Sequence, residues 1–178
     1  VPISEKSAEE IFAAAAPSVA TVKSDYKQGT GFIARVANGK MYIITNKHVF
    51  ERNETTVSDS AELEFFDGRK ANGKLIGYDT YHDIAVVAAD VFASGALSEL
   101  AFTTSDGLNY AQNVFLIGNA LGRGIGAFDG IVSVPDQILS VKESGKTVPT
   151  VQTTVPINSG CSGGPVFDMF GYVVGVGT

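Results

Sequence analysis

The stretch Gly160-Cys161-Ser162-Gly163-Gly164-Pro165 places one serine among glycines near the C-terminal end of the 178-residue chain. A serine hydroxyl is a weak nucleophile at neutral pH. It becomes reactive when a histidine takes its proton and a carboxylate holds that histidine in the correct tautomer. If Ser162 is a nucleophile, the fold must therefore bring a histidine and an acid to it from elsewhere in the chain.

Two upstream segments supply these groups. Residues 45–49 (Thr-Asn-Lys-His-Val) carry one of the two histidines, and residues 81–85 (Tyr-His-Asp-Ile-Ala) carry an aspartate at the start of an apolar run. The order His48, Asp83, Ser162 is the chain order of a chymotrypsin-type triad. The three residues are too far apart in the sequence for local contacts, so only a folded scaffold can assemble them.

The glycines beside Ser162 have chemistry of their own. Attack on a carbonyl creates an oxyanion, which is stabilised by backbone N–H groups aimed at one point. Gly160 and Gly163 permit the tight, positive-φ backbone that turns such groups inward. The expected donors are the N–H groups of Gly160, Cys161 and Ser162. The plainer alternative is that Ser-Gly-Gly-Pro is only a turn between strands.

Longer segments resemble the HtrA (Deg) family of serine proteases, in the family's order and over nearly the whole chain. They are residues 29–33 leading to 43–49, residues 116–122 followed by 130–133, and residues 151–167 continuing to 171–176. The resemblance implies that His48 is the base, Asp83 the orienting acid and Ser162 the nucleophile. It also implies a serine endopeptidase acting on unfolded or flexible proteins, with homo-oligomers that are trimers and a location outside the cytoplasm.

The sequence departs from the HtrA pattern around the nucleophile. Cys161 stands where the family usually has Asn, Ser159 where it usually has Pro, and residues 154–156 (Thr-Val-Pro) replace the common Asp-Ala-Ala. An alternative function is therefore a protease-like fold that is held inactive and acts as a binding or regulatory module. A third class, an esterase or transferase, is disfavoured because the serine does not lie on a strand-turn-helix elbow.

The spacing of short apolar runs and turn residues predicts an all-β fold of two antiparallel Greek-key β-barrels, chymotrypsin-like, with a short N-terminal helix. Ser7 and Glu10 match a capping box for that helix. Asn38-Gly39, Asp67-Gly68 and Asn72-Gly73 favour tight hairpins. The expected strands are residues 18–24, 31–37, 40–45, 61–66, 71–78 and 84–88, and then 113–117, 126–134, 147–154, 165–168 and 172–176.

With these strands, the resemblance to HtrA proteins implies one protease domain, residues 1–178, and we expect no PDZ domain within them. It divides into a helical segment (1–17), a first barrel (18–105) and a second barrel (106–178), and the active site lies between the barrels. HtrA-like domains continue beyond the strand that ends near residue 176, so we expect the second barrel to lack its last strand and to leave an open edge.

A small apolar pocket is expected beside the nucleophile. Six residues before Ser162, where trypsin-type enzymes place an acid, the chain has Pro156. Val155, Pro156, Ile157 and Val174 are the candidate pocket residues. They predict cleavage after medium aliphatic residues such as Val, Ile or Leu.

Composition limits the partners. Hydrophobic residues make up 44% of the chain, enough for a core, and the formal charge of −6 disfavours nucleic acid and anionic membranes. No apolar run is long enough to span a bilayer. One cysteine and two histidines predict no metal site, and no cofactor is expected. The expected partner is a protein or peptide substrate.

Three other features favour structural interpretations. The single cysteine, Cys161, is expected to be packed and to contribute a backbone N–H, with a redox switch as the less favoured alternative. His82 is expected to be a surface or hydrogen-bonded structural histidine. The glycine-rich segment 118–126 lacks the ending of a P-loop and is interpreted as a loop flanking the cleft.

Overall fold

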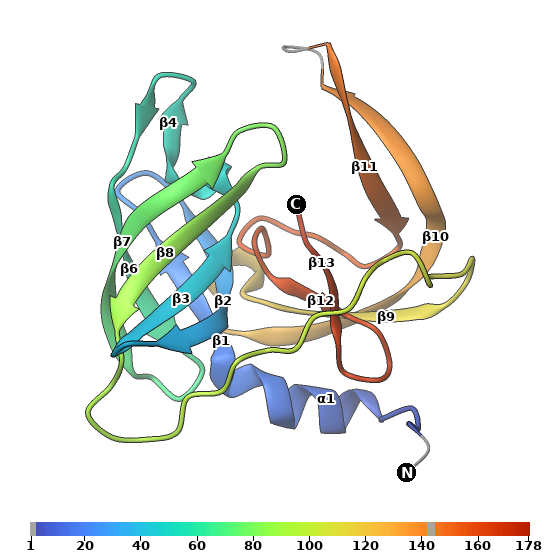
Figure 1. Cartoon of the computed structure of the whole chain (residues 1–178), viewed down its shortest axis with the longest axis horizontal. Helices are drawn as coiled ribbons and strands as arrows, with labels where there is room; N and C mark the ends of the chain where they lie inside the picture. The colour runs from blue at the N-terminus through green and yellow to red at the C-terminus, as the bar shows by residue number, and fades with distance from the viewer. Residues whose placement is uncertain (1–2, 142–144) are drawn as a thin grey trace.

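The computed structural model describes residues 3–141 and 145–178, which form a short helix followed by antiparallel strands (Figure 1). The helix α1 spans Ala8–Ala15 and begins with the predicted capping box. Ser7 accepts a hydrogen bond from the Glu10 N–H at 3.2 Å, and the Glu10 carboxylate accepts one from the Ser7 N–H at 3.3 Å. The sequence therefore predicted the start of this helix correctly.

The first half of the chain closes into a barrel with the strand order β1-β2-β3-β8-β7-β6. Its strands are β1 (Val19–Lys23), β2 (Gln28–Ala37), β3 (Lys40–Thr45), β6 (Ser60–Phe65), β7 (Lys70–Asp79) and β8 (Ile84–Asp90). Buried and exposed residues alternate strictly along β6, as a strand with one face on a core requires. Residues from all six strands fill the barrel interior, including Val22, Ile33, Ile43, Leu63, Ala71 and Val87.

The turns of this barrel confirm two of the predicted hairpins and contradict the third. Asn38 and Gly39 both have positive φ, 52° and 74°, as a tight turn between β2 and β3 requires. Gly68, with φ 88°, lies between β6 and β7. Asn72-Gly73 is not a turn, because both residues lie inside β7 and pair with β6. Gly73 serves close packing, since a Cβ there would lie 2.3 Å from a methyl carbon of Val87.

One short hairpin was not predicted from the sequence. Strands β4 (Glu51–Asn53) and β5 (Thr56–Val57) form a two-stranded sheet directly after the 3₁₀ helix η2 (Lys47–Phe50). The Asn53 side chain accepts hydrogen bonds from the N–H groups of Thr55 and Thr56 and so builds the turn.

The second half forms an open five-stranded sheet with the order β11-β10-β9-β12-β13. Its strands are β9 (Asn113–Gly118), β10 (Gly126–Val141), β11 (Lys146–Thr153), β12 (Pro165–Phe167) and β13 (Val173–Val176). The sheet curls beside the barrel, and the long β10–β11 hairpin rises from it (Figure 1). Among the described residues, β11 and β13 are the outer strands of this sheet.

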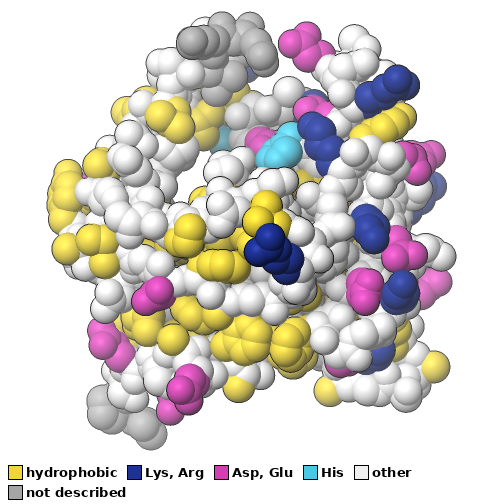
Figure 2. All heavy atoms as spheres, turned by 180° about the vertical axis from the view of Figure 1, so that it is seen from behind, with side chains coloured by type: hydrophobic (Ala, Val, Ile, Leu, Met, Phe, Trp, Pro, Cys, Tyr) yellow, Lys and Arg dark blue, Asp and Glu magenta, His cyan; other side chains and the backbone are white. Residues whose placement is uncertain are grey.

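A shared hydrophobic cluster fixes the two halves relative to each other. It joins Ile11 of α1, Phe32 of β2, Ile117 of β9 and Phe167 of β12, all buried. On the face shown in Figure 2, charged side chains of both signs are interspersed over the first barrel. None of the described helices has the length and hydrophobicity that a membrane span would need.

Candidate active site

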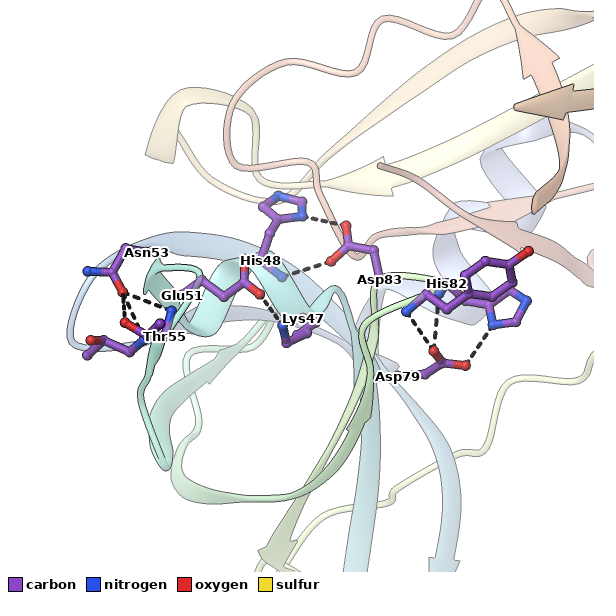
Figure 3. Close-up of polar contacts among 10 residues, drawn as sticks. Lys47, His48, Glu51, Asn53, Thr55, Asp79, His82 and Asp83 are labelled. Atoms are coloured by element: carbon purple, nitrogen blue, oxygen red, sulfur yellow. Dashed lines mark hydrogen bonds and ion pairs between the residues drawn. The ribbon is translucent and has the colours of Figure 1, made fainter. Parts of the chain in front are cut away.

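His48 and Asp83 meet at one end of the first barrel (Figure 3). His48 lies on η2, just after β3, and Asp83 immediately precedes β8, the strand that pairs with β3. The His48 Nδ1 atom is 2.6 Å from Asp83 Oδ2, and the His48 backbone N–H donates to Asp83 Oδ1 at 2.8 Å. The carboxylate therefore holds both the ring and the backbone of the histidine, which leaves Nε2 as the outward ring nitrogen.

The backbone of Asp83 is held as firmly as its side chain. Its φ of 55° is uncommon for a non-glycine residue. Its carbonyl accepts hydrogen bonds from the Lys47 N–H at 3.2 Å and from Asn46 Nδ2 at 2.9 Å. The segment carrying His48 thus fixes the aspartate that orients His48.

A third donor to the carboxylate was not predicted from the sequence. The Thr178 hydroxyl donates to Asp83 Oδ2 at 3.0 Å from just beyond β13. Burial acts to raise the pKa of Asp83, but the hydrogen bonds from the His48 ring, the His48 N–H and Thr178 outweigh it, so this pKa lies below its usual value. Asp83 is therefore ionised at neutral pH and can stabilise a protonated His48.

His82 is the structural histidine that the sequence predicted. Its Nδ1 lies 2.6 Å from Asp79 Oδ2, and Asp79 also accepts from the N–H of Tyr81 at 2.8 Å (Figure 3). Both side chains of the pair are about half exposed. The Tyr81 hydroxyl donates to the carbonyl of Thr147 on β11. This pair therefore braces a surface turn that contacts the second sheet.

The loop before Ser162 has the backbone geometry of a type II turn. The Cys161 N–H donates to the carbonyl of Asn158 at 2.9 Å, and Gly160, the third residue of the turn, has φ 95°. A Cβ on Gly160 would lie 2.2 Å from the carbonyl oxygen of Asn119, so glycine is required here for space as well as for conformation.

The turn directs the Gly160 N–H away from its neighbouring loop. The carbonyl of Ser159 accepts a hydrogen bond from the Leu121 N–H at 2.7 Å. In a planar trans peptide the C=O and the following N–H point in opposite directions. The Gly160 N–H therefore points away from the Leu121 N–H and is not used by the bond that holds this peptide.

One of the three predicted oxyanion donors is engaged elsewhere. The Cys161 N–H is used within the turn, by the bond to Asn158, so it is not a free donor to a substrate. Gly160 and Ser162 are left as the candidates. The Cys161 side chain is fully buried, as predicted, and burial raises the pKa of its thiol.

His48 and Ser162 both line one cavity of about 670 Å³. It is lined by Lys27, Gln28, His48, Val49, Leu121, Gly122, Ser159, Gly160 and Ser162. The predicted loop of residues 118–126 thus flanks the cleft, through Leu121 and Gly122. Among the described residues no hydrogen bond joins the Ser162 hydroxyl to the His48 ring, and such contacts are often loose in free enzymes.

The predicted pocket residues do not line this cavity. Val155 is 5% exposed and packs in a core cluster with Cys161 and Val174. Pro156 and Ile157 are exposed, and Ile157 lies beside Gly177 after β13, where a Cβ would be 3.6 Å from its side chain. Within the described ranges no three His, Cys, Asp or Glu side chains gather as metal ligands would.

Comparisons with known proteins identify the family of the chain. Residues 29–176 match the model of the trypsin-like peptidase domain. The chain is 35% identical over 153 residues to a serine protease Do-like HtrA of Bacillus subtilis, covering 83% of this chain and 32% of that protein. It is also 35% identical to a probable periplasmic serine endoprotease DegP-like of Halomonas elongata, covering 83% and 28%.

A solved structure supports the same relationship. The HtrA-type protease AlgW with a tripeptide superimposes with a TM-score of 0.78 at 29% identity, covering 97% of this chain and 54% of that one. The chain spans about a third of the length of the curated relatives that it matches.

Proposed function

Because the chain belongs to the trypsin-like peptidase domain family and its relatives are HtrA-type proteases, we propose that it is the catalytic domain of a serine endopeptidase. Ser162 is the nucleophile, His48 the general base and then the general acid, and Asp83 the orienting acid. The observation that carries this proposal is the His48–Asp83 contact of 2.6 Å at a cavity that Ser162 also lines.

The proposed reaction follows from these positions. The Ser162 hydroxyl attacks the scissile carbonyl and gives its proton to His48 Nε2, while Asp83 stabilises the imidazolium. The negative charge that develops on the carbonyl oxygen is met by the N–H groups of Gly160 and Ser162. His48 then protonates the leaving amine, and water repeats the sequence to release the acyl group from Ser162.

The type II turn argues against the inactive alternative. A peptide flip at Gly160 would turn its N–H away from the substrate and abolish the oxyanion site. The bonds from Leu121 to the Ser159 carbonyl and from Cys161 to the Asn158 carbonyl hold the turn in the other orientation. Because free Nε2 and Ser162 share a cavity with this turn, proteolysis is favoured over a purely binding role.

The substrates that we propose are unfolded or flexible proteins, cleaved after medium aliphatic residues. Exposed Ile157, beside Gly177, and half-buried Val174 of β13 supply apolar surface, and Pro156 stands where trypsin-type enzymes place an acid. In a peptide-library digest we expect Val, Ile and Leu before the cleaved bond, and a preference for Lys or Arg would contradict this.

The family relationship also supports proposals on assembly and location. We propose a homo-oligomer, a trimer by resemblance to HtrA proteins, and a location outside the cytoplasm, since one relative is named a probable periplasmic endoprotease. Analytical ultracentrifugation tests the first proposal, and fractionation of the source cells tests the second.

A fluorophosphonate probe tests the central proposal, with the adduct mapped by mass spectrometry and casein digestion compared with Ser162→Ala. We expect labelling at Ser162 and a loss of digestion of about 10⁴-fold or more in the variant. A folded protein that is neither labelled nor proteolytic would contradict the proposal and favour the binding module. Hydrolysis of small esters without proteolysis would favour an esterase.

A further inference from the structure

Thr30 of β2 contacts the loop that carries Ser162 (residues 158–164, here the nucleophile loop) and is fully buried. Its hydroxyl donates to the carbonyl of Gly160 at 2.6 Å and accepts from the Asn119 N–H at 3.0 Å. Its backbone N–H donates to the carbonyl of Ser162 at 2.8 Å. One residue of the first barrel therefore binds three backbone groups of the second half, two of them in the nucleophile loop.

The carbonyl that Thr30 holds belongs to the oxyanion turn. The Gly160 C=O and the Cys161 N–H lie on one peptide, whose two ends are bound by the Thr30 hydroxyl and by the Asn158 carbonyl. The preceding peptide is bound through its Ser159 C=O by the Leu121 N–H. Both peptides that flank Gly160 are thus held, and their orientation sets the direction of the Gly160 N–H.

The same hydroxyl also holds the loop that supplies Leu121. Thr30 accepts from the N–H of Asn119, two residues before Leu121, while the Asn119 side chain binds Thr21 and the N–H of Gly124. Leu121 itself has φ 57°, a conformation that a non-glycine residue adopts at a cost. The loop therefore needs its anchors to present the Leu121 N–H to the turn.

The Thr30 backbone is itself held by the barrel. Its carbonyl accepts a hydrogen bond from the Thr45 hydroxyl at 2.7 Å, and Thr45 ends β3, three residues before His48. A Cβ on Gly163 would lie 2.0 Å from this carbonyl, so the nucleophile loop packs directly on the Thr30 backbone.

We propose that Thr30 is a positioning residue for the oxyanion site: its hydroxyl holds the Gly160 carbonyl and the Asn119 N–H together, so that the Gly160 N–H points at the developing charge. This inference rests on the proposed function, because it assigns the Gly160 N–H to the oxyanion. Replacing the hydroxyl by a methyl group leaves a buried carbonyl and a buried N–H without partners, which favours rotation of the peptides that carry them.

Three variants test the proposal. Thr30→Val keeps the shape but removes the hydroxyl, and Thr30→Ser keeps the hydroxyl. Ser18→Ala is the matched control, because the buried Ser18 hydroxyl, just before β1, donates to the Ser98 carbonyl at 2.7 Å and not to the loop that carries Ser162. Kinetics on an aliphatic peptide anilide give kcat and KM for each variant.

We expect Thr30→Val to lower kcat about 10-fold to 100-fold with KM nearly unchanged, since the lost stabilisation is specific to the transition state. Thr30→Ser should restore most of the rate, and Ser18→Ala should lower Tm without lowering kcat. Equal kcat in folded Thr30→Val and in wild type would overturn the proposal, as would an equal loss in Ser18→Ala.

Amide hydrogen exchange gives a second readout that needs no activity. We expect the N–H groups of Leu121 and Cys161 to exchange faster in Thr30→Val than in Ser18→Ala at matched stability. If the wild type is inactive, the proposed function fails, and the exchange rates still decide whether Thr30 positions the turn. Unchanged exchange at both amides would overturn the positioning role.

Discussion

Two histidine–aspartate pairs lie close together in the sequence and have the same contact, yet their surroundings differ (Figure 3). In both, the ring Nδ1 lies 2.6 Å from a carboxylate oxygen. Asp83 also binds the Thr178 hydroxyl, and its partner His48 lines the cavity of Ser162. Asp79 instead binds the N–H groups of its own turn. In each pair the aspartate therefore orients the histidine ring, and the surroundings of Nε2 decide what that histidine can do.

The strongest test of this comparison removes each carboxylate in turn. Asp83→Asn should lower kcat/KM about 10⁴-fold, because an amide stabilises the wrong tautomer of His48 and cannot stabilise its protonated form. Asp79→Asn is the matched control and should leave kcat/KM nearly unchanged. Steady-state kinetics on a peptide substrate measure both. Similar losses in the two variants would show that the Asp79–His82 pair shares in catalysis.

A second test leaves both pairs intact and changes the turn at Gly160, which lines the same cavity as His48. Gly160→Ala puts a Cβ 2.2 Å from the Asn119 carbonyl oxygen. The turn therefore has to change its conformation, and the N–H of residue 160 is lost as an oxyanion donor. We expect kcat to fall about 10²-fold to 10³-fold. The rate of fluorophosphonate labelling at Ser162 should fall with it.

Gly39→Ala separates this effect from backbone strain alone. Gly39 also has positive φ, 74°, but a Cβ there would meet nothing within 4 Å. It should cost about 1–2 kcal/mol of stability with no change in kcat. If Gly160→Ala also keeps its kcat, the Gly160 N–H is not an oxyanion donor.

The comparison also explains what the sequence could predict. The order His48, Asp83, Ser162 and the alternating apolar runs predicted the triad candidates and the strands, because side-chain chemistry and periodicity are local properties. Thr30 lies in the HtrA-like segment 29–33, but nothing in the sequence marked its hydroxyl, or that of Thr178, as the partner of a distant carbonyl or carboxylate. The Cys161 N–H was counted as a donor because only the folded turn shows that Asn158 already uses it.

The errors in the fold have a similar cause. Asn72-Gly73 has the composition of a tight turn. Glycine is needed at position 73, however, because a larger residue would clash with Val87, a contact that exists only in the closed barrel. The β4–β5 hairpin is too short for a periodic pattern and depends on the Asn53 side chain for its turn. Local rules therefore fail where a distant neighbour decides the role of a residue.

A smaller effect is expected from the third donor to Asp83. Thr178→Ala removes a hydrogen bond to a carboxylate, and we expect kcat to fall about tenfold or less, because such bonds contribute about 1.5–3 kcal/mol when buried and this site is partly exposed. Thr178→Ser keeps the hydroxyl and should retain most of the rate. If kcat fell as far in Thr178→Ser as in Thr178→Ala, packing by the methyl group, and not the hydrogen bond, would support Asp83.

The smallest effect is the dependence of stability on pH, and it is expected for both aspartates. Hydrogen bonds lower the pKa of Asp83 against the effect of burial, and the hydrogen bond to His82 lowers that of Asp79. A lowered pKa stabilises the fold above the unfolded value of about 3.9, and this contribution is lost as the pH falls through that value toward the lower folded one. The gap in unfolding free energy between wild type and each Asn variant should therefore shrink from pH 7 to pH 3.

Salt separates the two carboxylates in the same measurement. Asp79 and His82 are about half exposed, so about 1 M salt should screen most of their interaction. Asp83 lies in a partly buried network of three donors, and its contribution should survive in part. Equal sensitivity to salt in Asp83→Asn and Asp79→Asn would mean that the two pairs are equivalent in stability, and that the cavity beside Ser162 alone distinguishes them.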